Sequence, residues 1–199
     1  MQTNLPKVLQ PLAGKYLIDH VLNTASQISQ KISVVVGYEK ELLIDHLSLN
    51  HNKVMTVFQA QQIGTADAVK TTLKDIDINE KILILYGDVP LIKEETLKKL
   101  CSQEFDLSIL TTNLENPTGY GRVLKDKENN VLRIIEEKDA DQEQKKIKEI
   151  FTGILVTNGN VLKKYIPEIN NNNSAKEFYL TDLIGIAHKN GFKINTLSS

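Results

Sequence analysis

A carboxylate that follows a buried strand is the first feature of this sequence that could do chemistry. Residues 82–86 form a continuous apolar run, typical of a parallel strand covered on both faces. Gly87 and Asp88 follow where the strand should end, and Pro90 stops further pairing. Because open α/β sheets bind ligands at the carboxyl ends of their strands, we expect Asp88 at the rim of a crevice. There it could bind Mg²⁺ together with substrate phosphates, or it could simply bond its own backbone in a turn.

Other residues in the first half have side chains suited to a nucleotide. Gln59 follows a short strand, and its amide offers a donor and an acceptor together, as a pyrimidine edge requires. Gly64 lets backbone approach a flat ring, and Thr65 opens the next helix, where it could serve only as an N-cap. Lys7 follows a proline that fixes the backbone. It could place an ammonium beside a phosphate, although a lone lysine is more often a solvated surface residue.

Two positions in the second half are suited to a sugar. Gly121 ends a turn-rich loop, 116–121, and could either admit a sugar close to the backbone or serve only the turn. Glu136 ends a predicted strand, where a carboxylate can accept hydrogen bonds from sugar hydroxyls. It also opens the charge run 136–139, and such runs most often form a solvated face.

Histidine and cysteine give no sign of a catalytic or metal centre. The four histidines are scattered without metal-ligand spacing, so we expect no zinc site from His20, His46, His51 and His188. Cys101 is the only cysteine, which excludes an internal disulfide and fits a reducing compartment. We expect it to be packed within a helix rather than nucleophilic.

Apolar periodicity predicts alternating strands and helices through residue 112. The strands are expected at 32–36, 54–58, 82–86 and 107–112, and the helices at 15–28, 39–47, 66–73 and 93–101. Such alternation favours a doubly wound, mainly parallel Rossmann-like α/β sheet.

Beyond residue 112 the pattern predicts an added mixed α/β lobe. Its strands are expected at 131–136, 150–156 and 193–197, with a highly charged exposed helix at 139–148 and a further helix at 181–189. We therefore predict one domain, 1–199, with a nucleotide-binding half, 1–112, and a sugar-binding half, 113–199.

Composition excludes several classes of function. The 41% hydrophobic content is ordinary for a globular protein, and the net charge of −1 gives no field that would draw the chain onto nucleic acid or a membrane. The apolar runs are too short to span a bilayer. We therefore expect a soluble cytoplasmic protein with small-molecule partners.

Six motifs occur in the order seen in the sugar-1-phosphate nucleotidyltransferases, and the chain resembles this family over essentially its whole length. Within the family it most resembles the pyrophosphorylase domain of the bifunctional bacterial enzymes that make UDP-N-acetylglucosamine, a peptidoglycan precursor. The motifs are Leu5-Pro6-Lys7-Val8-Leu9, Gln59 through Gly64-Thr65, Tyr86-Gly87-Asp88-Val89-Pro90, Pro117-Thr118-Gly119-Tyr120-Gly121-Arg122, Glu136-Glu137-Lys138-Asp139-Ala140 and Glu177-Phe178-Tyr179-Leu180-Thr181-Asp182.

The resemblance implies that UTP and N-acetylglucosamine 1-phosphate react to UDP-N-acetylglucosamine and pyrophosphate. It implies that Asp88 binds the catalytic Mg²⁺ and that Lys7 is the cation beside the phosphates. Gln59, Gly64 and Thr65 would read the uracil. The remaining assigned residues would line the nucleotide-sugar crevice, with Tyr86 and Gly87 as its floor and Gly121, Glu136, Tyr179 and Thr181 around the sugar.

The sequence departs from the family pattern at both ends and at one internal position. The family begins with a strand and a glycine-rich loop that ends Gly-Thr-Arg-Met, and it has an Asn metal ligand beyond Ser199 and an acetyltransferase domain that forms trimers. We therefore expect a chain truncated at both ends, weakly active or inactive, with no evident basis for forming oligomers. Phe151 stands where the family usually has Asn, a change that bears on how the sugar is held.

Two other interpretations remain open at this point. The chain could be a non-enzymatic relic that at most binds a nucleotide sugar. It could also be a related hexose-1-phosphate nucleotidyltransferase with another sugar or base.

Overall fold

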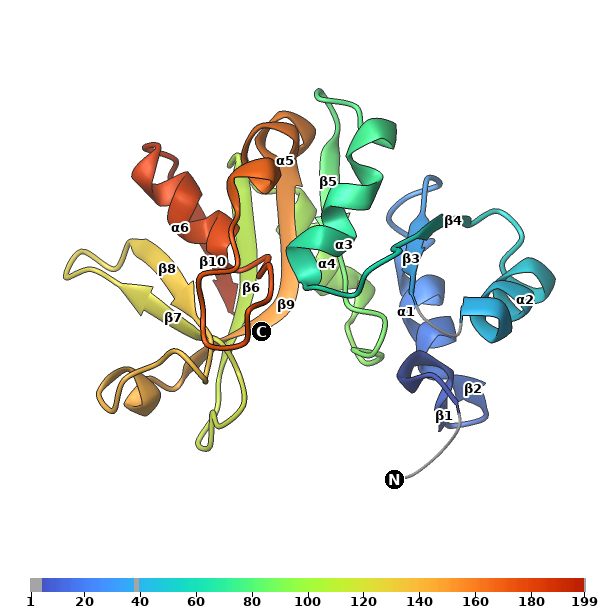
Figure 1. The fold of residues 1–199 in the computed structure, drawn as a ribbon, viewed down its shortest axis with the longest axis horizontal. Coiled ribbons are helices and arrows are strands. Elements are labelled where there is room, and N and C mark those ends of the chain that lie inside the picture. The colour runs from blue at the N-terminus through green and yellow to red at the C-terminus, as the bar shows by residue number, and fades with distance from the viewer. Residues whose placement is uncertain (1–4, 38–39, 199) are drawn as a thin grey trace. The chain divides into compact units, whose positions relative to one another are not determined.

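The structure of the protein is a computed structural model that describes residues 5–37 and 40–198. The chain, drawn as a ribbon in Figure 1, forms two compact units. Each unit has a hydrophobic core of its own. The first unit comprises Met1–Gln62 and Leu85–Lys99, and the second comprises Ile63–Ile84 and Leu100–Ser199. The chain therefore passes between the units three times, the last time within helix α4 (Glu94–Cys101).

Helix α1 and a short parallel strand pair organise the first unit. Its elements are η1 (Lys7–Leu9), β1 (Pro11–Leu12), β2 (Lys15–Tyr16), α1 (Leu17–Ala25), β3 (Ser33–Val36), α2 (Lys40–Asn50) and β4 (Met55–Phe58). β3 and β4 pair in parallel, from Ser33 opposite Met55 to Val36 opposite Phe58. The apolar stripe of α1 meets that of α2 over one core, which contains Leu9, Ile18, Leu22, Val36, Leu43 and Leu47.

A tight hairpin introduces α1. β1 and β2 pair antiparallel, and the two residues between them, Ala13 and Gly14, have φ of 50° and 83°. Positive φ at both central residues is the type I′ geometry that matches the twist of a two-residue hairpin. The hairpin fixes where α1 begins, and the backbone N–H of Tyr16 donates to Asp19 Oδ2 at 3.0 Å across the first turn.

A mixed sheet forms the centre of the second unit. Its strands are β5 (Lys81–Ile84), β6 (Leu107–Asn113), β7 (Arg122–Lys125), β8 (Val131–Ile135), β9 (Glu149–Asn158) and β10 (Ile194–Ser198). They pair in the order β10-β6-β9-β7-β8, and β5 also pairs with β9. β10 runs parallel to β6, whereas every pairing of β9 is antiparallel.

Helices pack on this sheet and close the second core. They are α3 (Thr65–Thr72), η2 (Leu73–Asp75), η3 (Gln144–Lys146), α5 (Gly159–Tyr165), η4 (Ile166–Glu168) and α6 (Asp182–Lys189). α6 packs against β8, where Gly185 lies close to the side chain of Arg133. The core includes the fully buried side chains of Leu107, Ile109, Leu155, Leu162, Leu183 and Ile184.

The predicted α/β class is confirmed, and most predicted elements are found within a few residues of their expected ends. The helix predicted at 139–148 is wrong, because only η3 forms there. Asp141 Oδ1 accepts the backbone N–H groups of Glu143 and Gln144, a local turn that competes with helix formation. The pattern also missed β7, α5 and the β1–β2 hairpin.

The division into units does not coincide with the halves 1–112 and 113–199, which describe binding roles and stay a prediction. None of the helices among residues 5–37 and 40–198 has the length and apolar character of a membrane span.

Candidate functional site

The first unit brings two of the predicted residues, Lys7 and Asp88, into direct contact. Lys7 Nζ donates to Asp88 Oδ2 across 2.5 Å. Lys7 opens η1, which buried Leu9 anchors in the core. Asp88 lies in a turn closed by a 3.2 Å hydrogen bond from the Val89 N–H to the Tyr86 carbonyl. The expected position of Asp88, just beyond a strand, is thus found, although β5 ends at Ile84.

Gly87 packs closely beside this contact. A Cβ atom at Gly87 would lie 3.1 Å from Val8 Cγ1 and 3.2 Å from Ile18 Cδ1. A side chain there would require Val8 or Ile18 to shift by a few tenths of an ångström. Gly87 therefore has a definite steric role beside the ion pair.

The Lys7–Asp88 pair is exposed and adds little to stability. The Lys7 side chain is 77% exposed and that of Asp88 is 25% exposed. Exposed pairs contribute about 0–1 kcal/mol, so a ligand could replace either partner at low cost. The residues fit Mg²⁺, because Asp88 offers a second carboxylate oxygen beside the one that accepts from Lys7, and Mg²⁺ takes one or two carboxylates plus phosphate oxygens.

The three residues predicted to read a base are divided between the units. Gln59 is buried directly after β4, and its N–H donates to the Val36 carbonyl at 2.9 Å. Gly64 and Thr65 belong to the second unit. Their joint role in base recognition stays a prediction.

Gly64 and Thr65 bind a distant part of their own chain. A Cβ atom at Gly64 would lie 2.3 Å from the Phe178 carbonyl oxygen, so only glycine fits there. Thr65 Oγ1 accepts the Leu180 N–H at 2.9 Å, and the Ala66 N–H donates to the Phe178 carbonyl at 2.8 Å. The expectation that Thr65 caps α3 is wrong, since Gly64 is the cap residue and Thr65 is the first helical residue.

The second unit brings together Gly121, Glu136 and Thr181, three of the residues predicted for the sugar site. Thr181 Oγ1 donates to Glu136 Oε1 at 2.8 Å. A Cβ atom at Gly121 would lie 3.5 Å from both carboxylate oxygens of Glu136 and 2.8 Å from Ile134 Cγ2. The Glu136 carboxylate thus lies against the backbone of Gly121 and accepts one hydrogen bond, from the hydroxyl of Thr181.

Other acids surround this carboxylate and change its electrostatics. Burial raises the pKa of Glu136, and the nearby acids Asp182, Asp139 and Glu177 raise it further, while the Thr181 hydrogen bond opposes them. Burial and Asp139 also raise the pKa of Asp182. The negative charges disfavour an anionic group beside the Glu136 carboxylate, and a neutral part of a ligand that is rich in hydroxyl or amide donors suits this position better.

Tyr179, also predicted for the sugar site, lies in the same acidic surroundings. Burial, together with Asp139, Glu177, Glu136 and Asp182, raises its pKa to about 12. The phenol is protonated at neutral pH, as an ordinary tyrosine is, and can donate a hydrogen bond.

An ion pair between a buried arginine and a partly exposed glutamate, missed by sequence reasoning, supports the loop that contains Gly121. Arg122 is 1% exposed, and its Nη2 donates to Glu137 Oε2 at 2.5 Å. Its Nη1 donates to the Tyr120 carbonyl, and the Gly119 N–H donates to Glu137 at 3.3 Å. The Arg122 hydrogen bond lowers the pKa of Glu137. The pair was missed because the charge run 136–139 was interpreted as a solvated face.

Phe151 is a core residue of the second unit. Its side chain is buried in the core, and its N–H donates to the Gly121 carbonyl at 2.9 Å. It therefore supports the backbone of the Gly121 loop.

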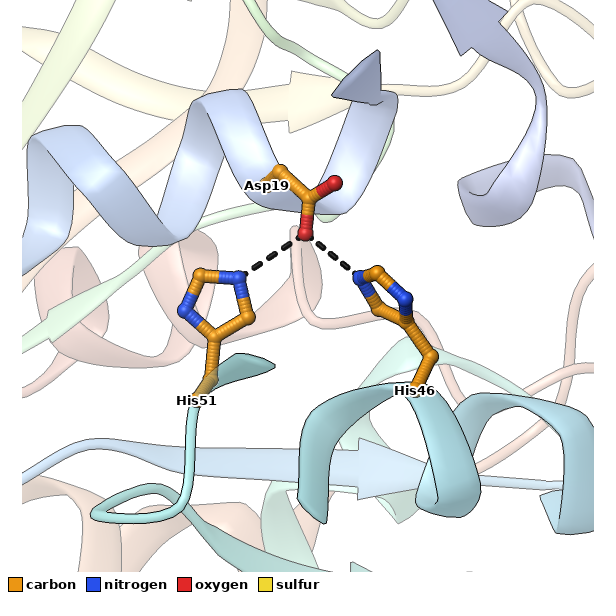
Figure 2. A group of neighbouring side chains, drawn as sticks. All are labelled: Asp19, His46 and His51. Atoms are coloured by element: carbon orange, nitrogen blue, oxygen red, sulfur yellow. Dashed lines mark hydrogen bonds and ion pairs between the residues drawn. The ribbon is translucent and has the colours of Figure 1, made fainter. Parts of the chain in front are cut away.

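The expectation that the histidines are scattered is also wrong for two of them. His46 and His51 both contact Asp19, with Nε2–Oδ1 distances of 2.6 and 2.8 Å (Figure 2). The sequence signal for this cluster was that His46 and His51 are five positions apart near the end of the helix predicted at 39–47. No feature of the neighbouring sequence indicated that Asp19 would contact them.

A cavity of about 800 Å³ in the second unit lies away from these residues. It is found where β5, β6 and β10 begin, and its lining includes Lys81, Asp106 and Lys193. None of the predicted site residues lines this cavity. We therefore base the candidate site on the direct contacts among the predicted residues and not on the cavity.

Comparison with solved structures defines the class of fold. An inositol-1-phosphate CTP transferase from T. maritima superposes with a TM-score of 0.75 at 18% identity, over 98% of this chain and 77% of that one. A structure described as a glucose-1-phosphate thymidylyltransferase from Bacillus anthracis, in complex with a sucrose, gives 0.74 at 18% identity, over 97% and 78%. The fold is that of nucleotide-diphospho-sugar transferases.

The family follows from the sequence match. The MobA-like NTP transferase domain matches residues 1–146, and the chain belongs to this family. The protein is an enzyme of the nucleotidyltransferase type.

Proposed function

We propose that the protein transfers a uridylyl group from UTP to N-acetylglucosamine 1-phosphate, which yields UDP-N-acetylglucosamine and pyrophosphate. The observation that carries the choice of acceptor is the Glu136 carboxylate, held by Thr181 at 2.8 Å and in contact with Gly121. A carboxylate in an acidic, half-buried setting suits the hydroxyl and amide donors of a neutral amino sugar. Tyr179 would add a protonated phenol on the far side of that sugar.

Lys7 and Asp88 would serve the phosphates. An oxygen of the sugar phosphate attacks the α-phosphorus of UTP, a new P–O bond forms, and pyrophosphate leaves with the electrons of the broken bond. Such a reaction depends on positioning and on neutralising charge. Lys7 would exchange its 2.5 Å contact with Asp88 for a phosphate oxygen. Asp88 would then hold Mg²⁺, which when bound supplies further charge neutralisation.

The remaining predicted residues complete the proposal. Gln59, Gly64 and Thr65 would recognise the uracil, and Tyr86 and Gly87 would line the crevice. We expect the reaction in the cytoplasm, as a step toward peptidoglycan precursors.

A related hexose-1-phosphate nucleotidyltransferase is the second candidate. Phe151 is an apolar core residue at a place where the enzymes that make UDP-N-acetylglucosamine usually have Asn. The solved structures from T. maritima and Bacillus anthracis are named for other nucleotides and other acceptors. Either candidate uses the same roles for Lys7 and Asp88 and differs in the base and the sugar.

A matrix of substrates tests the proposal. The purified chain with Mg²⁺ is incubated with UTP, dTTP, CTP or GTP and with the 1-phosphates of N-acetylglucosamine, glucose, mannose or inositol, and pyrophosphate release is measured. We expect the fastest release with UTP and N-acetylglucosamine 1-phosphate, and its loss in Asp88→Asn but not in the exposed control Asp75→Asn.

The other outcomes separate the alternatives. Fastest release with another pair would support the second candidate. No release with any pair, together with a thermal shift by UDP-N-acetylglucosamine, would support a binding protein. Neither release nor a shift would contradict the proposal.

A further inference from the structure

Two histidines and an aspartate of the first unit converge on one point (Figure 2). The Nε2 atoms of His46 and His51 lie 2.6 and 2.8 Å from the same oxygen, Asp19 Oδ1. One ligand atom from each of the three residues lies within 4.8 Å of the other two. From this convergence we propose that Asp19, His46 and His51 bind a divalent transition-metal ion, with Zn²⁺ as the best fit.

The three ligands come from separate elements that a common core holds in place. Asp19 lies in the first turn of α1, His46 lies in α2, and His51 follows the end of α2. The neighbouring core residues Ile18 and Leu47 pack α1 and α2 in the same cluster. Because the fold already positions the ligands, binding an ion would not require ordering of the chain.

The outer contacts leave the ligand atoms oriented toward one another. The Tyr16 N–H donates to Asp19 Oδ2 at 3.0 Å, so the oxygen directed at the histidines is Oδ1. The Tyr16 ring meets His46 edge-on, with the centroids 4.9 Å apart. The Asn50 side-chain amide lies 3.2 Å from His46 Nδ1 and donates from Nδ2 to the His46 carbonyl at 3.0 Å, so Asn50 contacts the ring nitrogen of His46 that does not face Asp19.

The donor set selects the class of metal. Imidazole suits zinc and its neighbours among the transition metals, whereas Mg²⁺ and Ca²⁺ prefer all-oxygen sites. Zinc also binds carboxylate oxygen, and sites with three protein ligands keep a fourth position for water. The side chains of Asp19, His46 and His51 are 13%, 15% and 16% exposed, so solvent reaches them.

A small cavity adjoins this cluster. It has a volume of about 200 Å³, and its lining includes Asn50, His51 and Val54. Of the three proposed ligands only His51 lines this cavity, so water or an exogenous ligand held there would lie beside the cluster. The ion itself would hold α1 and α2 together through coordinate bonds in place of the present hydrogen bonds.

Zinc titration of the whole chain tests the site without nucleotide or sugar. The protein is treated with a chelator and exchanged into metal-free buffer, and ZnCl₂ is titrated by calorimetry. We expect one ion per chain, a higher melting temperature, and affinity reduced by at least about tenfold in His46→Gln and in His51→Gln. His188→Gln, which alters a histidine in α6 of the second unit, is the control and should bind Zn²⁺ as the unaltered chain does.

Two measurements on the unaltered chain keep the test decisive if a variant does not fold. Crystals soaked in ZnCl₂ should show an anomalous peak between Asp19 Oδ1 and the two Nε2 atoms, and added Co²⁺ should give the visible spectrum of a nitrogen- and oxygen-ligated ion. Equal affinity in the folded histidine variants, or an anomalous peak elsewhere only, would overturn the proposal. None of these readouts depends on nucleotidyltransferase activity, so failure of the metal site and failure of the proposed reaction are distinguishable.

Discussion

Lys7 Nζ lies 2.5 Å from Asp88 Oδ2, although about 80 positions of sequence separate the two residues. Gly87 packs tightly beside this contact, since a Cβ atom there would lie 3.1 Å from Val8 Cγ1 and 3.2 Å from Ile18 Cδ1. Because the pair is exposed, a ligand can reach it, and its contribution to the free energy of unfolding is small.

Lys7→Met should separate activity from stability. We expect kcat/KM for pyrophosphate release to fall by about 10²–10³, by analogy with loss of a donor that stabilises transition-state charge. The free energy of unfolding should change by less than about 1 kcal/mol, because the pair is exposed. Urea unfolding and the release assay check this. A variant with full activity would contradict the role of Lys7.

Gly64→Ala should destabilise the second unit strongly. Its φ is 137°, and a Cβ atom would lie 2.3 Å from the Phe178 carbonyl oxygen, so the cost should be about 2–5 kcal/mol. Gly191→Ala is a matched control, since Gly191 has φ of 80° but nothing within 4 Å, and about 1 kcal/mol is expected there. Chemical unfolding of the two variants compares them directly, and equal losses would rule out the close approach.

Glu136→Gln should stabilise the protein at neutral pH and weaken binding of the sugar. Burial raises the pKa of Glu136 above its ordinary value of 4.5, so the folded state holds this proton more tightly than the unfolded state. The free energy of unfolding of the unaltered chain therefore decreases as the pH rises from below 4.5 through the pKa of Glu136 in the folded state. The variant has no carboxyl group at this position and does not show this decrease. Urea unfolding from acidic to neutral pH should show the difference growing with pH, whereas the exposed control Glu168→Gln should track the unaltered chain.

Arg122→Met should destabilise the second unit by about 2–3 kcal/mol. Breaking a fully buried ion pair costs about 3–5 kcal/mol, but Glu137 is 27% exposed and keeps contact with water. Arg133, the other arginine of the chain, is exposed on β8, and Arg133→Met serves as the control. Thermal unfolding measures both. Equal decreases in melting temperature in the two variants would show that burial of Arg122 does not determine its contribution to stability.

Local sequence determined the order and type of most elements. Apolar periods identified β3, β6, β9, α1 and α6 within a few residues, because each period reflects which face of one element is buried. The helix predicted at 139–148 did not rest on an apolar stripe, because this stretch is highly charged, and Asp141 there bonds nearby backbone N–H groups instead. The position of Asp88 just beyond a strand could also be predicted, because the residues that end a strand are its neighbours in the sequence.

Tertiary structure alone decided which polar groups meet. Thr65 bonds Leu180, 115 positions away, and Asp19 joins His46 and His51 at separations of 27 and 32. Such contacts arise because buried faces of distant elements pack on one core, and their polar neighbours are then brought together. A periodic pattern records that a face is buried, but not which other face covers it.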